Sequence, residues 1–169
     1  MRLALWLIPD ELVRARAAAL IDALARELGR PPFPPHVTLL AGLRDAESDV
    51  VERARTLARE LRPMRAALGA LHHGPEYFRA VFVEVSAAEL PEVHRRAARA
   101  LDAAPDPAFA PHLSLLYGEV ARETREAVVE RAGRRWDLSC ALARLDVVDT
   151  EGPVEAWTTR ARLILGPAV

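Results

Sequence analysis

The sequence predicts an α+β protein of two lobes, in which two antiparallel sheets face a central cleft, helices lie on the outside and a pseudo-twofold internal repeat relates the halves. Three observations predict this architecture. Strand-like and helix-like segments alternate along all 169 residues, no Gly/Ser-rich linker separates them, and one eight-residue segment occurs twice in similar form. We therefore expect residues 1–169 to form a single two-lobed domain.

The first third of the chain predicts a strand, a helix and a second strand. The apolar run RLALWLIP at residues 2–9 ends at a proline, as a strand can. Residues 10–29 have apolar positions at helical spacing, with Asp10 suited to cap the helix and Gly29 to end it. The prolines of PPFPP then impose an extended backbone on the entry to residues 36–43, which we predict to be a strand.

The remaining segments continue the alternation. Residues 47–62 carry apolar side chains on one helical stripe and charged side chains opposite, which is typical of a helix lying on a sheet. The same periodicities predict two further helices at residues 88–102 and 124–133. They also predict strands at residues 64–74, 77–86, 112–120, 136–150 and 156–166.

The repeated segment reads PHVTLLAG at residues 35–42 and PHLSLLYG at residues 111–118, and the copies align without a gap. Each follows a loop that contains proline and phenylalanine, so the likeness extends to the flanking sequence. Residues two apart in a strand project from the same face. Each copy thus projects a histidine and a hydroxyl together: His36 with Thr38, and His112 with Ser114. Two such strands at a cleft would gather four polar side chains.

The composition limits the kinds of ligand and partner that the protein can bind. The formal net charge is −1, so the chain as a whole offers no basic coat for nucleic acid or a membrane, and an anionic ligand must be held locally. All 23 basic residues are arginine, which weakens the argument from any single arginine. The lone Cys140 excludes an intramolecular disulfide and predicts a buried, inert thiol. The N-terminal apolar run is too short for a signal peptide or a membrane span, so we expect a cytoplasmic protein.

The paired H-x-[T/S] segments, with ALWLIP before them and YFRAVFVEV between them, resemble the two-histidine phosphoesterase superfamily. More narrowly, they are similar to its cyclic phosphodiesterase branch, known from plants and fungi. The resemblance implies a hydrolase without metal or cofactor that opens 2′,3′-cyclic nucleotides or related cyclic ribose phosphates, such as ADP-ribose 1″,2″-cyclic phosphate, to the 2′-phosphate. It implies catalytic roles for His36 and His112 and substrate binding by Thr38, Ser114, Tyr117 and Trp6.

The residue types suit this chemistry. Ring opening needs a base to take a proton from water and an acid to protonate the departing ribose oxygen. Two imidazoles, each with an ordinary pKa of about 6.5, can hold these opposite protonation states. The hydroxyls of Thr38 and Ser114 can donate hydrogen bonds to phosphate oxygens. The sequence leaves open which histidine is the base, with a slight preference for His112.

Other residues carry weaker signals. Strand alternation puts Tyr117 on the face opposite His112 unless the chain bends near Gly118. His72 and His73 lack partners at metal-ligand spacing and predict an exposed strand end. The remaining candidates are Tyr77 and Phe78 as aromatics before a strand, His94 as a surface residue of a helix, and Arg79 and Arg160 as positive charges near the cleft.

Two alternatives stay open. An RNA 2′,3′-cyclic phosphodiesterase, similar to the 2′-5′ RNA ligases and acting on RNA 3′ ends, would use the same chemistry, although no basic, aromatic-rich strip is evident for tracking a polynucleotide. A non-catalytic nucleotide-binding module would keep the cleft, but binding alone needs no pair of proton-transfer groups. We expect a small-molecule cyclic nucleotide or cyclic ribose phosphate as the partner, a monomeric protein and no membrane association.

Overall fold

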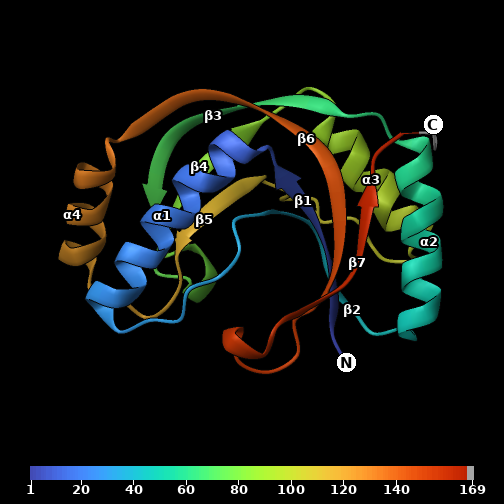
Figure 1. Ribbon diagram of the computed structural model, residues 1–169, viewed down its shortest axis with the longest axis horizontal. Helices are drawn as coiled ribbons and strands as arrows, with labels where there is room; N and C mark the ends of the chain where they lie inside the picture. The colour runs from blue at the N-terminus through green and yellow to red at the C-terminus, as the bar shows by residue number, and fades with distance from the viewer. Residues whose placement is uncertain (167–169) are drawn as a thin grey trace.

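The computed structural model describes residues 1–166, and Figure 1 shows how its elements are arranged. Within this range the helices are α1 (Glu11–Leu28), α2 (Glu47–Glu60), α3 (Leu90–Ala100) and α4 (Arg122–Ala132), with short 3₁₀ turns η1 (Tyr77–Arg79) and η2 (Val154–Ala156). The strands are β1 (Leu3–Pro9), β2 (Val37–Leu43), β3 (Met64–His73), β4 (Val81–Ser86), β5 (His112–Leu116), β6 (Arg135–Asp149) and β7 (Thr158–Ile164). Every predicted strand and helix is present, in the predicted order.

The strands form one antiparallel sheet in the order β1-β2-β5-β4-β3-β6-β7, and an additional pairing of β1 with β6 closes it into a barrel. This corrects the expectation of two separate sheets. The physical reason is the length of β6, whose first half pairs with β3 and whose second half pairs with both β1 and β7. Because β6 serves both halves, the sheet closes on itself, and a single registered pair, Val37 with Leu113, joins β2 to β5.

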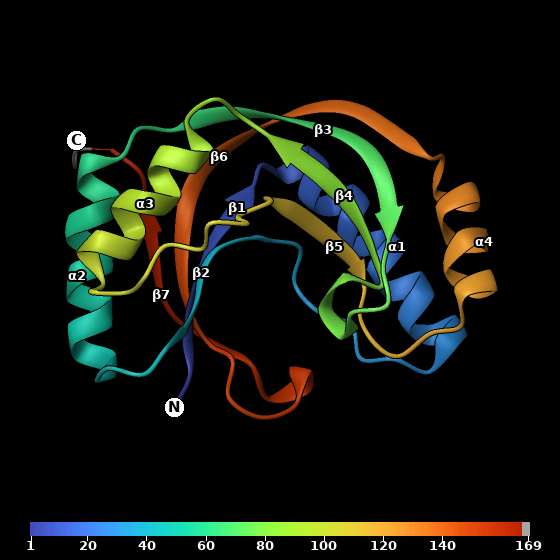
Figure 2. The same ribbon diagram turned by 180° about the vertical axis from the view of Figure 1, so that it is seen from behind.

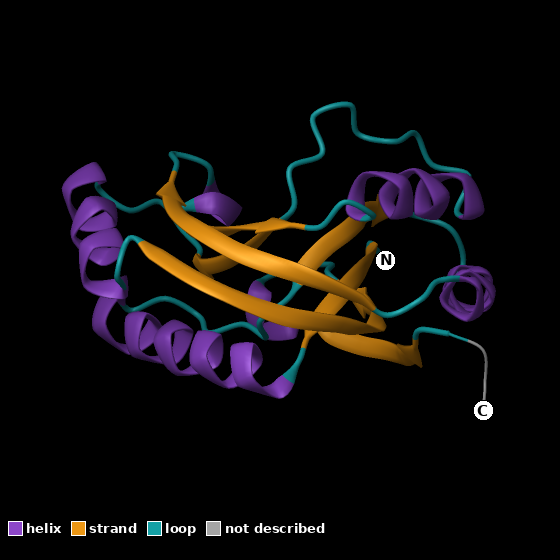
Figure 3. Cartoon of the chain, turned by 90° about the horizontal axis from the view of Figure 1, so that it is seen from above, coloured by secondary structure: helices purple, strands orange, loops and turns teal. Residues whose placement is uncertain are grey.

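The helices cover the outside of the sheet in two pairs. α1 and α4 lie over one side of the molecule, and α2 and α3 lie over the other (Figures 1 and 2). The view from above separates the same pairs (Figure 3). The predicted ends of α1 are confirmed, since the Asp10 carboxylate accepts a hydrogen bond from the amide of Val13 and Gly29 adopts a left-handed φ of 61°. The second Asp10 oxygen accepts from the amide of Ala141 at 2.7 Å, which ties the helix start to β6.

The two faces of β1 pack against different parts of the molecule. All seven residues of this strand are buried, because side chains of the protein cover both of its faces. Leu3, Leu5 and Leu7 belong to the main core. Trp6 faces the other way, in a small apolar cluster with Ala4, Ile8 and Val148 against which Trp157 packs. A continuous apolar run with no polar alternation is typical of such a doubly covered strand.

Other predictions concern the single thiol and the membrane. Cys140 is buried and unpaired, and burial raises the pKa of its thiol to about 11, in agreement with the predicted inert cysteine. Within residues 1–166, none of the helices combines the length and the apolar character that a transmembrane span requires.

Candidate active site

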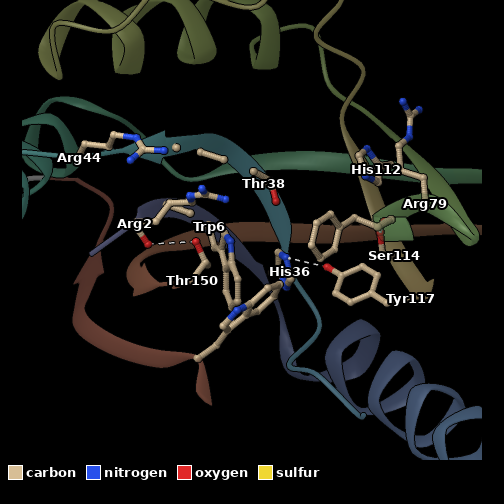
Figure 4. Close-up of a pocket in the computed structure, with 15 residues that line it drawn as sticks. Arg2, Trp6, His36, Thr38, Arg44, Arg79, His112, Ser114, Tyr117 and Thr150 are labelled. Atoms are coloured by element: carbon tan, nitrogen blue, oxygen red, sulfur yellow. Dashed lines mark hydrogen bonds between the residues drawn. The ribbon is translucent and has the colours of Figure 1, made fainter. Parts of the chain in front are cut away.

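The two motif strands lie side by side and open onto one hollow. β2 and β5 pair through Val37 and Leu113, the residues that directly follow the motif histidines. The adjoining hollow of about 540 Å³ (Figure 4) has a size common for small-ligand sites. Its lining includes every site residue expected from the sequence: Trp6, His36, Thr38, His112, Ser114 and Tyr117.

Both histidine rings are oriented by the same kind of local hydrogen bond. The Nδ1 atom of His36 lies 2.6 Å from the carbonyl oxygen of Pro34, and Nδ1 of His112 lies 2.8 Å from the carbonyl oxygen of Ala110. In each case the partner is the residue two positions earlier, beyond the motif proline. Because a carbonyl can only accept, each Nδ1 carries the proton and donates it. Nε2 of each neutral ring is therefore the atom that carries the lone pair and can accept a proton.

His36 is the more deeply buried of the two, with 5% of its surface exposed. Its ring stacks on Trp6, and the Tyr117 hydroxyl lies 3.4 Å from its Nε2. Burial is the main cause that lowers the pKa of His36 from 6.5 to about 4; the charge of His112 lowers it further, and the hydrogen bond to Pro34 opposes the shift. His36 is thus neutral at physiological pH in the free protein.

His112 is half-buried and stands nearer the solvent. Burial lowers its pKa below the ordinary value, the Arg79 guanidinium lowers it further, and the hydrogen bond to Ala110 acts in the opposite direction. The Coulombic influence of His112 on His36 shows that the two rings share one electrostatic environment. An anionic ligand between them would raise both pKa values, because it favours the protonated forms.

The two hydroxyls differ in how they are engaged. Ser114 is buried, and its Oγ donates to the Phe78 carbonyl oxygen at 2.8 Å. Thr38 faces the hollow (Figure 4), and its side chain makes no hydrogen bond to any residue within 1–166. Thr38 is therefore ready to donate to a ligand, whereas Ser114 must turn its hydrogen away from Phe78 before it can do so.

Tyr117 reaches the hollow because β5 ends at Leu116. The following Gly118 has a φ of 121°, which favours glycine, so the chain turns where the alternation argument requires a bend. The Tyr117 ring stacks on Phe33 with centroids 3.6 Å apart. Burial raises the pKa of its hydroxyl above 10, so the group stays neutral and able to donate to His36.

Comparison with known proteins agrees with this geometry. The family model of the 2′-5′ RNA ligase superfamily matches residues 4–153. The chain belongs to this superfamily. The resemblance to the two-histidine phosphoesterases is thereby confirmed. A curated relative, the cyclic phosphodiesterase of Arabidopsis thaliana, is 28% identical over 172 residues, covering 97% of this chain and 95% of that protein.

Solved structures show the same fold. The protein TT0787 of Thermus thermophilus superposes with a TM-score of 0.65 at 23% identity, and each chain is covered over 100% of its length. LigT of Escherichia coli, solved with NADP⁺, gives a TM-score of 0.62 at 18% identity over 97% of each chain. The barrel and its helices are therefore the fold of this superfamily.

Further residues of the hollow had weak or no signals in the sequence. Phe78 is 51% exposed, and its ring centroid lies 5.9 Å from that of Trp157 and 5.1 Å from that of Tyr117. Arg79 lines the hollow near His112, and its guanidinium also lies over the Phe82 ring. Arg160 forms ion pairs with Asp149 and Glu47 and does not line the hollow. Arg2 and Arg44 line the end of the hollow beyond Thr38 (Figure 4).

His94 is buried, which corrects the expectation of a surface position. Its Nδ1 donates to the Leu39 carbonyl oxygen at 2.8 Å, and its Nε2 accepts from the amide of Asp106 at 2.9 Å. The ring also stacks on Phe109 at 4.1 Å. His94 thus joins α3 to the residue after Thr38 and to the loop that leads into β5. The helical pattern alone could not show this, because both partners are distant in sequence.

His72 and His73 lie at the end of β3, as expected. His72 is exposed and pairs with Glu84 at 3.2 Å, and His73 approaches Glu126 at 3.9 Å. Throughout the described part of the chain, no three side chains of His, Cys, Asp or Glu gather as metal ligands would.

Proposed function

We propose that the protein hydrolyses 2′,3′-cyclic nucleotides or related cyclic ribose phosphates without a metal ion and leaves the 2′-phosphate. The observation that carries this proposal is the pair of imidazoles, each held through Nδ1 by the carbonyl two residues earlier and each lining one hollow. Two such groups, each with an Nε2 atom that can accept or donate a proton, suit proton transfer on either side of a phosphate. The likeness to a relative named cyclic phosphodiesterase supports the same reaction class.

The proposed reaction uses each histidine once. The neutral imidazole takes a proton from water while the water oxygen forms a bond to phosphorus. The other histidine, protonated in the phosphate complex, gives its proton to the 3′ oxygen as the bond from that oxygen to phosphorus breaks. The pair ends with one proton, as it began, and is reset by exchange of that proton between the two sites through solvent. The low pKa values of both rings mean that the bound phosphate itself must favour the protonated acid.

Charge on the phosphate oxygens would be stabilised from two directions. Thr38 offers an unengaged hydroxyl, and Ser114 offers a second after it turns from Phe78. Arg79 adds a full positive charge beside His112. Such preorganised donors stabilise a transition state more than a ground state when they point to where charge develops.

The nucleoside would be held by stacking. The exposed face of Phe78 and the edge of Trp157 offer aromatic surface at the mouth of the hollow. Trp6, by contrast, is buried against His36 and so supports the histidine more than it contacts a base. A base stacked on an aromatic side chain typically gains about 1–3 kcal/mol.

We also infer that a pseudo-twofold relation links the two motifs, as two related lobes would require. It is supported by the antiparallel pairing of Val37 with Leu113 and by the identical carbonyl contacts of the two histidines. The proposed site is complete within one chain, which supports a monomer as the working unit.

Turnover of adenosine 2′,3′-cyclic phosphate in EDTA tests the proposal, with chromatography to separate the 2′- and 3′-phosphate products. We expect 2′-AMP from the wild type and a loss of at least about 100-fold in kcat/KM for His36→Ala and His112→Ala. Wild-type rates in both variants would exclude the assignment. Tight nucleotide binding without turnover across a panel of cyclic phosphates would instead indicate a binding module.

An RNA 3′ end is the second candidate substrate. It is favoured by the match to the 2′-5′ RNA ligase superfamily and by the exposed aromatic surface of Phe78 at the mouth of the hollow. The discriminating measurement is the ratio of kcat/KM on a short RNA ending in a cyclic phosphate to that on the mononucleotide. A large ratio that falls steeply with salt would favour RNA.

A further inference from the structure

The hollow continues past the proposed phosphate position to an end lined by arginine. Beyond Thr38, its walls are formed by the start of β1 and the end of β2, where Arg2 and Arg44 lie (Figure 4). Their neighbours in the lining, Ala4, Ala41 and Gly42, have small side chains or none and leave space above the strands. Gly42 has a φ of 78°, and a bulge interrupts the pairing there, so the strand edge bends at this place.

The two arginines face each other across the strand pair. Leu3 and Leu43 are registered partners of β1 and β2, so Arg2 and Arg44, one residue further in opposite directions, come next to each other in the antiparallel register. Like charges directly opposite each other in a sheet destabilise it. Such an arrangement is understandable if both charges serve a ligand.

No acid compensates these charges. Within residues 1–166 neither guanidinium takes part in an ion pair or a side-chain hydrogen bond. Two acids near Arg2 have other partners: Asp149 pairs with Arg160 at 2.8 Å, and Glu151 pairs with the N-terminal amine at 3.1 Å. Asp45 follows Arg44 in the sequence but does not line the hollow. Among the described residues, the lining of the hollow contains three arginines and two histidines but no aspartate or glutamate. The whole hollow is therefore suited to an anion with more than one charged group.

The end of the hollow that Arg2 and Arg44 line is separated from the histidines by several residues of β1. Trp6 is registered with Thr38, and Arg2 stands four residues before Trp6, which corresponds to about 13 Å along a strand. The backbone of Arg2 thus lies well away from the phosphate position between the histidines, and its side chain is placed to meet a different part of the same ligand. A ligand that contacts both ends must carry its two charged groups about one nucleoside apart.

We propose that Arg2 and Arg44 form a subsite for a second phosphate of the substrate, linked through the 5′ oxygen of the nucleoside whose cyclic phosphate is opened. This inference rests on the proposed function. The guanidinium groups would grip the phosphate oxygens through charge-assisted hydrogen bonds, for which the fork of an arginine is well shaped. The protein then discriminates in favour of substrates with a 5′-phosphate, a 5′-pyrophosphate bridge or a 5′-phosphodiester over the plain cyclic nucleoside phosphate.

The test compares adenosine 2′,3′-cyclic phosphate with its 5′-phosphorylated form. We expect wild-type kcat/KM to be at least about tenfold higher for the 5′-phosphorylated substrate, since a charge-assisted contact contributes roughly that factor. Arg2→Gln and Arg44→Gln should each lower this ratio, and the double variant should bring it close to one. Arg59→Gln removes an exposed arginine of α2 from outside the hollow and should keep the wild-type ratio. Added salt should lower the wild-type ratio as well.

Two further substrates identify the source of the second phosphate. A preference for ADP-ribose 1″,2″-cyclic phosphate that the double variant loses would indicate a pyrophosphate-bridged small molecule. A preference for a dinucleotide with a terminal cyclic phosphate would indicate an RNA end. A wild-type ratio near one, or a double variant that retains the wild-type ratio, would overturn the subsite.

Failure of the subsite can be distinguished from failure of the proposed hydrolytic function. If neither adenosine substrate is turned over, the proposed function fails, and calorimetry then judges the subsite alone. Adenosine 2′,5′-bisphosphate should bind the wild type at least about tenfold more tightly than 2′-AMP, and the double variant should bind both with similar affinity. Equal affinities in the wild type would overturn the subsite in that case too.

Discussion

Trp6 lies flat against His36, with ring centroids 3.5 Å apart and 9° between the ring planes. Trp6 belongs to β1, and His36 directly precedes β2, whose register with β1 brings Trp6 opposite Thr38. The contact leaves His36 with 5% of its surface exposed. Trp6 thus contributes, with Phe33 and Tyr117, to the burial that lowers the pKa of His36.

Replacing Trp6 should raise the pKa of His36. Burial is the largest cause of its low value of about 4, so Trp6→Leu, and more strongly Trp6→Ala, should move it toward 6.5 by admitting water. NMR titration of the His36 ring measures the change. Trp6→Phe keeps an aromatic ring at the site and should retain a low value. A His36 pKa that stays near 4 in a folded Trp6→Ala protein would contradict the assigned cause.

Stability should fall as the pH is lowered from neutral toward 4. The folded-state pKa of His36 lies below its unfolded value of 6.5, so the unfolded chain binds more protons between these two values and protonation favours unfolding. The stabilisation is complete above 6.5 and is lost as the pH falls to about 4. The shift corresponds to at most about 3 kcal/mol.

Urea unfolding at several pH values in this window measures the effect. His36→Asn removes the titrating group, so its stability should depend less on pH than that of the wild type. Ser114→Ala alters the same site without removing an ionisable group and should keep the wild-type slope. Equal slopes for His36→Asn and the wild type would show that His36 does not carry the dependence.

The pH profile of kcat/KM should be bell-shaped, with its maximum on the acid side of 6.5. The free enzyme needs one protonated and one neutral histidine, and the pKa values of both are lowered from 6.5. Above the upper value the acid is lost, and below the lower value the base is lost. The limbs belong to the coupled pair, not to either residue alone. A maximum on the alkaline side of 7, with chemistry limiting the rate, would contradict this account.

The hydroxyl variants should behave differently from the histidine variants. Thr38→Ala and Ser114→Ala remove donors that carry no titrating proton, so they should lower the whole profile and leave its limbs nearly in place. Loss of one such donor typically costs about 100-fold or more. Thr38→Ala should cost more than Ser114→Ala, because the Ser114 hydroxyl must first give up its bond to Phe78. Limbs that move with either variant would show a role in proton transfer.

The sequence predicted those features that depend on interactions between residues close together in the chain. The cap at Asp10 and the end of α1 at Gly29 followed from turn chemistry, and the grouping of His36, Thr38, His112 and Ser114 followed from the spacing within the repeated motif. Trp6 and Tyr117 were expected at the hollow only from the family resemblance. The closed barrel did not follow from the sequence, because it depends on β6 pairing with strands from both halves of the chain. The sequence named Arg79 and Arg160 alike as positive charges near the cleft, and with 23 arginines in the chain only the fold separates Arg79 in the hollow from Arg160 outside it. Arg2 and Arg44 had no signal in the sequence.

His94 shows how a residue outside the hollow can hold both motifs in place. Its ring accepts from the amide of Asp106 and donates to the carbonyl of Leu39, so His94→Ala would leave the buried Leu39 carbonyl without this partner, free the exposed Asp106 loop and remove the stack on Phe109. Unsatisfied buried groups cost about 1–3 kcal/mol each. We expect a loss of about 1–3 kcal/mol in the free energy of unfolding, measured by urea denaturation, while His73→Ala at the end of β3 should change it by less than about 1 kcal/mol.

Activity supplies a second readout for His94. If its two hydrogen bonds position Thr38 and the loop before His112, then His94→Ala should lower kcat under conditions where the protein is still folded, without moving the limbs of the pH profile. His94→Gln keeps a donor and an acceptor and should recover part of both stability and kcat. A His94→Ala protein as stable and as active as the wild type would show that the loop and β2 hold their positions without this bridge.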